Sequence, residues 1–123
     1  MSFDHYEIIP LDTFNDNLEK YFRRDKARIL DKLKQNLENI PNRYEMLKSP
    51  MTIAGMKLVG LRHIKVGVSG YKGGSVTKFR ICKECLDNGY YITSKVKCEF
   101  CDKDKPYRVI LFDILPRSFG YNR

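Results

Sequence analysis

The stretch YRVILFDIL, residues 107–115, is rich in β-branched and aromatic side chains, which is typical of a β-strand. Two earlier segments have the same character: residues 75–82, SVTKFRIC, and residues 58–68, in which apolar and polar side chains alternate. SGYKGGS, residues 69–75, carries three glycines and predicts the turn between these two strands. The second half of the chain therefore predicts three successive strands.

The first half predicts a short strand and two helices. YEIIPL, residues 6–11, is strand-like, and its proline marks a sheet edge or a strand end. Apolar side chains then recur at helical spacing up to Pro41. Thr13 and Asp25 stand where each could cap a helix. We therefore expect two antiparallel helices on one face of a small sheet, with one bent helix as the alternative.

Residues 41–56 contain two prolines and a glycine and predict a loop. The order of one strand, two helices and three strands predicts an α+β fold, in which two N-terminal helices pack on a small antiparallel β-sheet. The length of 123 residues predicts a single domain over residues 1–123. No apolar run is long enough to span a membrane and no secretory signal is visible, so we expect a cytoplasmic protein.

The formal net charge of +8 is unevenly distributed along the chain. Residues 42–80 carry eight Lys and Arg but a single acid, Glu45, whereas the segments before and after are nearly balanced. Such clustering indicates a polyanionic partner, most often nucleic acid. A merely solubilising surface is the alternative.

All four cysteines lie in CKECLDNGYYITSKVKCEFC, residues 82–101. They form two CxxC pairs, Cys82 with Cys85 and Cys98 with Cys101, separated by twelve residues. This spacing predicts a zinc ribbon inserted into the domain, with one tetrahedral Zn²⁺ held by four thiolates. A closed site of this kind leaves no coordination position for water, so the zinc would be structural. The alternatives are redox dithiols and disulfides, and reducing conditions in the cytosol disfavour disulfides.

With the cysteine segment removed, the remaining pieces resemble the RelE-like toxin family of ribosome-dependent mRNA endonucleases. The matching pieces are the helical pair ending at ENIPN, the basic strand LRHIKVG, the motif FRI and the terminal RSFGY. They cover most of the chain outside residues 82–105. The resemblance implies a RelE-like fold whose last two strands are joined by the zinc ribbon, where ordinary members have a short hairpin.

The resemblance also implies a set of site residues. Arg80 and Arg117 would bind the scissile phosphate, because the arginine fork holds phosphate oxygens bidentately. Tyr121 would stack on a base or take part in proton transfer. Lys65 or His63 would accept the proton of the 2′-hydroxyl as that oxygen attacks the next phosphate. The further basic side chains expected to contact RNA are Arg62, Lys57, Lys72 and Lys78. Strand alternation places Arg62 on the face opposite His63 and Lys65.

Two points stay open at this stage. GYK, residues 70–72, also resembles the aromatic–basic pair that opens the third strand in some members, and Lys72 would then replace Arg80 in the site.

The function implied by the resemblance has mRNA on the ribosome and a protein antitoxin as partners. The antitoxin would cover the basic face with an acidic amphipathic segment. The other readings are a non-catalytic zinc-ribbon regulator that binds nucleic acid, and a toxin of another target such as gyrase.

Overall fold

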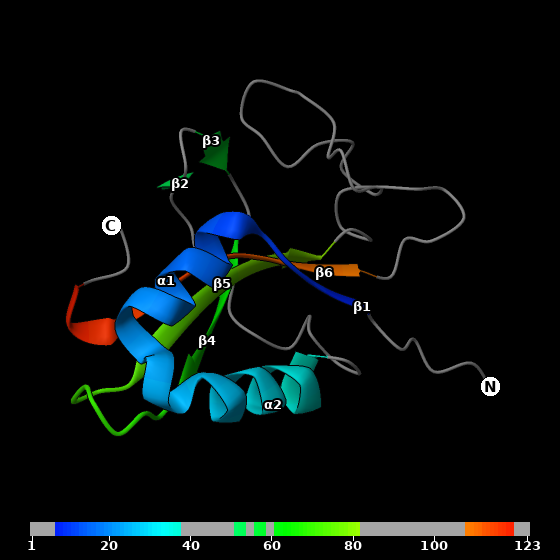
Figure 1. The fold of residues 1–123 in the computed structure, drawn as a ribbon. Helices are drawn as coiled ribbons and strands as arrows, with labels where there is room; N and C mark the ends of the chain where they lie inside the picture. Colours follow the sequence, from blue (N-terminus) through cyan, green and yellow to red (C-terminus); the bar gives the residue numbers. More distant parts are fainter. Residues whose placement is uncertain (1–6, 38–50, 54–55, 59–60, 82–107, 120–123) are drawn as a thin grey trace.

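The computed structural model describes residues 7–37, 51–53, 56–58, 61–81 and 108–119 (Figure 1). The element order confirms a mixed α+β fold. The elements are β1 (Glu7–Pro10), α1 (Asp12–Phe22), the 3-10 turn η1 (Arg23–Asp25), α2 (Lys26–Leu37), β2 (Met51–Ile53), β3 (Met56–Leu58), β4 (Arg62–Val66), β5 (Ser75–Ile81), β6 (Arg108–Pro116) and the 3-10 turn η3 (Arg117–Phe119).

The main sheet has four strands in the order β1-β6-β5-β4. Strands β4, β5 and β6 pair antiparallel, as expected, but β1 pairs parallel with β6. The expectation of an all-antiparallel sheet is therefore wrong for β1. A parallel partner requires a long crossover rather than a hairpin, and here the helices and the intervening strands supply it.

The small strands β2 and β3 pair antiparallel in a separate two-stranded sheet. β2 falls inside residues 41–56, so the expectation of a loop is wrong at residues 51–53. The expected strand over residues 58–68 is also divided, because β3 ends at Leu58 and β4 begins at Arg62.

Helix α1 begins as soon as strand β1 ends. The amide of Leu11 donates a hydrogen bond to the carbonyl of Leu111 at 3.0 Å, and the Leu11 carbonyl accepts the first helical bond from the Asn15 amide at 3.0 Å. Leu11 is thus the residue that precedes the helix, and no side chain caps it. The expected cap at Thr13 is wrong, because the helix begins at Asp12 and Thr13 lies inside it. Leu11 is bonded to β6 through its amide and to the helix through its carbonyl, so strand β1 is followed by the helix without a linker.

The two helices are distinct, and η1 joins them without a break. In Figure 1 they meet at an elbow instead of lying side by side, so the expected antiparallel arrangement is wrong. The predicted cap residue Asp25 lies at this elbow. Its carboxylate accepts hydrogen bonds from the backbone amide of Ser69 at 3.3 Å and from its hydroxyl at 3.0 Å. Asp25 therefore ties the elbow to the turn between β4 and β5.

One core lies between the helices and the sheet. Each helix buries three apolar side chains spaced four residues apart, so that they line one face. These are Phe14, Leu18 and Phe22 in α1 and Ile29, Leu33 and Leu37 in α2. The strand residues in the same core are Ile64, Val66, Phe79, Ile81, Val109, Leu111 and Ile114.

A β-bulge changes which face of the sheet the second half of β6 presents. Lys78 of β5 pairs with Asp113, whereas the next residue of β5 pairs with Leu111, so Phe112 is an extra residue. Core residues in β6 accordingly change spacing, from Leu111 to Ile114. The bulge thereby places Asp113 on the face of the sheet opposite the helical core, next to Lys78.

Candidate functional site

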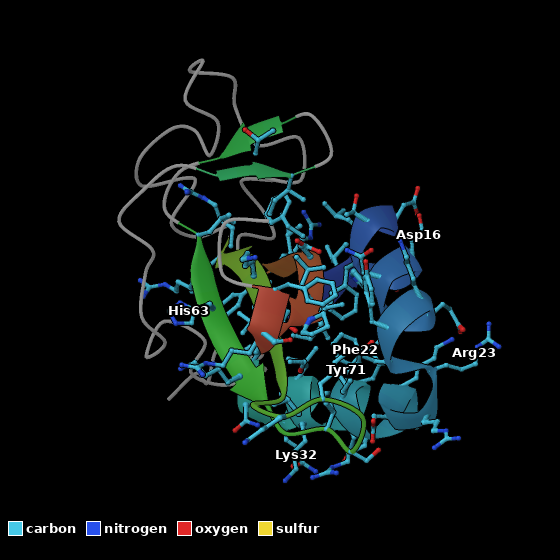
Figure 2. The ribbon with its side chains drawn as sticks, turned by 90° about the vertical axis from the view of Figure 1, so that its left-hand side faces the viewer. Asp16, Phe22, Arg23, Lys32, His63 and Tyr71 are labelled. Atoms are coloured by element: carbon cyan, nitrogen blue, oxygen red, sulfur yellow. The ribbon has the colours of Figure 1, made fainter. Side chains whose placement is uncertain are left out.

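The face of the sheet opposite the helical core carries half of the basic residues singled out in the sequence. On β4, Ile64 and Val66 point into the core, so His63 and Lys65 alternate to the opposite face. Figure 2 shows His63 projecting from β4 away from both helices. Lys78 and Arg80 of β5 share this face, and His63 pairs with Lys78 in the register. Arg62 lies on the other side by the same alternation, as predicted.

The centre of this face is buried, and it is not the open basic surface expected from the sequence. Lys78 is 0% exposed and Arg80 is 4% exposed. Lys78 therefore offers no surface to RNA in this structure, and its predicted role as an RNA contact is corrected to that of a buried member of the sheet. Its ammonium lies 4.0 Å from the Oδ2 atom of Asp113.

Asp113 is the acid that accompanies these buried cations. Its Oδ1 atom accepts a hydrogen bond from Nδ2 of Asn17 in α1 at 2.7 Å. Burial raises the pKa of Asp113 above its ordinary value, and it outweighs the hydrogen bond from Asn17 and the charge of Lys78, which both lower that pKa. The charged form of Asp113 beside Lys78 is therefore held at an electrostatic cost. Neither Asp113 nor Asn17 was singled out in the sequence. The signal for Asp113 was one acid inside an otherwise apolar strand.

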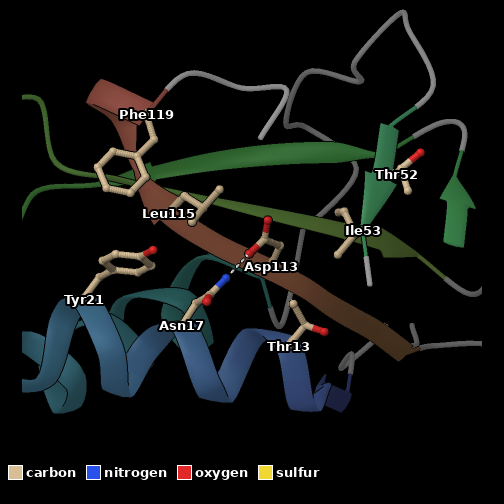
Figure 3. A pocket seen from close by; sticks show the side chains of 8 residues that line it. All are labelled: Thr13, Asn17, Tyr21, Thr52, Ile53, Asp113, Leu115 and Phe119. Atoms are coloured by element: carbon tan, nitrogen blue, oxygen red, sulfur yellow. Dashed lines mark hydrogen bonds between the residues drawn. The ribbon is translucent and has the colours of Figure 1, made fainter. Parts of the chain in front are cut away.

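A cavity of about 340 Å³ adjoins Asp113 (Figure 3). Its walls come from α1, β2, the second half of β6 and η3. The polar groups lining it are Thr13, Asn17, Tyr21, Thr52 and Asp113, and the apolar ones are Ile53, Leu115 and Phe119. Sequence reasoning missed this cavity, because its walls are brought together by the bulge and by the packing of α1 beside β6.

Arg80 and Arg117 were expected to bind one phosphate together. Arg80 pairs with Ile110 near one end of the β5–β6 ladder, while Ser75 at the other end pairs with the residue before Arg117. Ser75 and Arg80 are five positions apart in β5, which is about 17 Å of extended strand. The structure therefore does not bring the two arginines together, and Arg80 is buried whereas Arg117 is exposed.

Three exposed cations do lie at the end of the sheet where β5 begins and β6 ends. Lys65 belongs to the cross-strand row Lys65–Val76–Leu115, and Arg117 follows that row by two residues. Lys72 lies in the turn that joins β4 to β5. We call these three residues, Lys65, Lys72 and Arg117, the basic corner. All three are solvent-exposed.

The turn holds Arg117 in place. The Gly74 amide donates to the Tyr71 carbonyl at 3.1 Å, and Gly73 has φ +90°, as in a type II turn with Lys72 at its second position. The Arg117 amide donates to the Gly74 carbonyl at 2.9 Å. A Cβ atom built on Gly73 would lie 3.7 Å from Cδ of Arg117, which is van der Waals distance, so the arginine side chain lies against the turn.

Aromatic contacts anchor both sides of the basic corner to helix α1. The rings of Phe119, in η3, and Tyr21 meet edge to face with centroids 5.2 Å apart. Tyr71, in the turn, packs on Phe22 in the same way at 5.4 Å. The two segments that carry Arg117 and Lys72 are thereby fixed to one rigid element.

The remaining predicted residues fall partly outside the described chain. Lys57 belongs to β3, in the separate two-stranded sheet. Tyr121 and the cysteines Cys82, Cys85, Cys98 and Cys101 lie outside the described residues. Within the described ranges, no three His, Cys, Asp or Glu side chains are grouped so that they could hold a metal ion.

The flanks of the cysteine segment are described, and they lie on neighbouring strands. Ile81, the last residue of β5, pairs with Val109 at the start of β6. Residues 82–107 therefore leave and re-enter the sheet at the same end of one antiparallel pair. That is the end opposite the basic corner.

No protein-family model, no curated protein and no solved structure matches this chain. In the part of the chain that the structure describes, none of the helices is long and apolar enough to cross a membrane. Function is therefore inferred from the side chains and their geometry.

Proposed function

We propose that this protein binds RNA through its basic corner and cleaves it as a ribosome-dependent mRNA endonuclease of the RelE-like type. The observation that carries the proposal is the packing of Arg117 against the turn that bears Lys72, since both cations are exposed and belong to segments joined by a backbone hydrogen bond. An arginine in such a place keeps its charge and binds phosphate oxygens with a rigid fork of donors.

The order of the elements also supports this function. One strand and two helices are followed, after the small β2–β3 pair, by three strands that pair in antiparallel succession. The resemblance to RelE-like toxins implies one strand, two helices and three such strands. The cysteine segment is attached at the hairpin between the last two strands, where ordinary members of that family have a short connection. The strongly basic composition of residues 42–80 fits a polyanionic substrate.

In the proposed reaction the 2′-hydroxyl oxygen attacks the adjacent phosphorus and the 5′-oxygen of the next nucleotide leaves. Arg117 stabilises the negative charge that develops on the phosphoryl oxygens, and loss of one such donor typically costs a factor of about 10²–10³ in rate. Lys65, which is exposed on the same end of the sheet, or the half-buried His63 accepts the 2′ proton. Tyr121 supplies stacking on a base or transfers a proton.

The four cysteines would hold a structural Zn²⁺. Two CxxC pairs twelve residues apart supply the four thiolates that a closed tetrahedral site needs. The metal would shape the insertion and take no part in the cleavage. A protein antitoxin with an acidic amphipathic segment would neutralise the toxin by covering the basic corner.

A second function is favoured by one specific observation. Arg80, the expected partner of Arg117 on the phosphate, is 4% exposed and lies about five residues further along the ladder. A protein with this arrangement would bind RNA without cleaving it. The second proposal is therefore a non-catalytic regulator that binds nucleic acid on the same fold.

Inducible expression followed by mapping of mRNA ends on translating ribosomes separates the two functions. Codon-phased cuts that disappear in Arg117→Ala and persist in the exposed control Lys34→Ala, on α2, support the endonuclease. Binding of RNA with no cuts and no growth arrest supports the regulator. Cuts that survive unchanged in Arg117→Ala contradict the assignment of the basic corner.

A further inference from the structure

A recess of about 400 Å³ lies at the elbow between α1 and α2, beside the turn that joins β4 to β5. One side is formed by the end of α1 and by η1, and the other by Ser69, Gly70 and Tyr71. Two hydrogen bonds from the Ser69 hydroxyl and amide to Asp25 hold the two sides together. The shape of the recess is therefore fixed by hydrogen bonds between the helix elbow and the turn.

Cations gather around this recess. Lys20, Arg23 and Arg24 line it and all three are exposed. Arg23 forms an ion pair with Glu19 at 3.4 Å, and Figure 2 shows Arg23 at the outer side of the elbow. Within the described part of the chain no carboxylate pairs with Lys20 or Arg24, and Asp25 is engaged by Ser69. Two cations are thus available for an anionic ligand.

Aromatic rings form the floor of the same recess. Tyr21, Phe22 and Tyr71 all line it, and the Lys20 ammonium lies 5.2 Å from the centroid of the Tyr21 ring. Figure 2 shows Phe22 and Tyr71 lying against each other at the elbow. Cations combined with aromatic faces are the combination that single-stranded nucleic acid requires, since the cations take the phosphates and the rings take the bases.

The recess borders the turn that belongs to the basic corner. Tyr71, in its wall, precedes Lys72 in the chain and accepts the hydrogen bond that closes the turn under Arg117. Sequence analysis could not find it, because residues 1–41 carry seven basic and eight acidic residues and look neutral. The fold collects three of those basic residues at one end of α1, on the side where the turn lies.

We infer that this recess is a second phosphate-binding site, which takes a backbone phosphate of the same RNA strand that the basic corner binds. Lys20 and Arg24 contact the phosphate oxygens, and the exposed edge of Tyr71 contacts an adjacent base. The inference rests on the proposed RNA binding, and it extends the footprint from the basic corner round the turn to the helix elbow.

The test measures how the affinity for a short unstructured RNA depends on salt. Each phosphate contact to a single strand contributes about 0.7 to the slope of log K against log salt concentration, so loss of the one phosphate bound by Lys20 and Arg24 in Lys20→Ala/Arg24→Ala should lower the slope by about 0.7. The matched control Lys32→Ala/Lys34→Ala removes the same charge from α2, outside the recess, and should leave the slope within experimental error of the wild type. Equal loss in both double variants overturns the inference.

A second measurement keeps the inference separate from the proposed function. Inorganic pyrophosphate is titrated into the protein while the backbone amide signals of Ser69 and Gly70 are followed by NMR. Saturable shifts that disappear in Lys20→Ala/Arg24→Ala support the recess even if the protein binds no RNA, and their absence overturns it. Failure of Arg117→Ala to weaken RNA binding would count against the basic corner alone.

Discussion

Replacement of Asp113 by Asn tests the electrostatics at the centre of the sheet. Asp113 is 3% exposed, accepts one hydrogen bond from Asn17 and lies 4.0 Å from the Lys78 ammonium. Because burial raises its pKa above the ordinary value of 3.8, the folded protein binds a proton at this carboxyl more readily than the unfolded chain does. The charge on Asp113 therefore lowers the stability of the wild-type protein near neutral pH.

The sign and size of the effect follow from proton linkage. The contribution of Asp113 to the free energy of unfolding is largest below its unfolded pKa, and it falls as pH rises through the raised folded pKa. Each unit by which the folded pKa is raised lowers the stability above that pKa by about 1.4 kcal/mol. Asp113→Asn cannot titrate, so its stability relative to wild type should increase over the same pH window. At the acidic limit both side chains are neutral and the two proteins should differ little.

Urea unfolding of both proteins at several pH values measures this difference. Lys78→Met serves as a second variant, because it removes a charge that lowers the pKa of Asp113 and should make the decline with pH steeper. A difference between wild type and Asp113→Asn that stays constant with pH would refute the reasoning. So would a wild type that gains stability over Asp113→Asn as the carboxyl ionises.

Three further predictions concern the turn, the core and the metal. A Cβ atom on Gly74 would lie 2.6 Å from the Val66 carbonyl oxygen, whereas one on Gly73 would meet only ordinary contacts. In urea unfolding, Gly74→Ala should therefore lower the free energy of unfolding by more than Gly73→Ala does. Equal losses in the two variants would contradict this. Phe14→Ala, at a fully buried position, should lower the free energy of unfolding by about 3–5 kcal/mol. The exposed Leu30→Ala should lower it by less than about 2 kcal/mol. Similar losses of stability in the two variants would contradict the described core. The purified protein should contain one Zn²⁺ per chain by elemental analysis and lose it when one of the four cysteines is replaced by serine, and a metal-free wild type would rule out the zinc site.

Local sequence patterns predicted the long strands and the helical faces well. The segments 75–82 and 107–115 correspond to β5 and β6 to within one residue at each end, because runs of β-branched and aromatic residues that fill both faces of a strand have few alternatives. The alternation on β4 also placed His63 and Lys65 on one face and Arg62 on the other, as the register shows.

Features that depend on pairing between distant segments were not predictable in this way. The parallel pairing of β1 with β6 joins residues about a hundred positions apart, and nothing in YEIIPL specifies its direction. The burial of Lys78 depends on Asp113, which faces it only because Phe112 bulges out of register. A basic residue in a strand pattern looks the same in the sequence whether it lies on a rim or in the interior, so an exposed basic surface was expected where the structure has a buried ion pair.

The central claim is that RNA binds at the basic corner, and an NMR titration with a short single-stranded RNA tests it most directly. We predict that the backbone amide signals of Lys72, Gly73, Gly74 and Arg117 shift on addition of RNA, while those of Lys32 and Lys34 on α2 stay in place. Shifts confined to α2, or no shift at Gly73 and Arg117 at saturating RNA, would contradict the account.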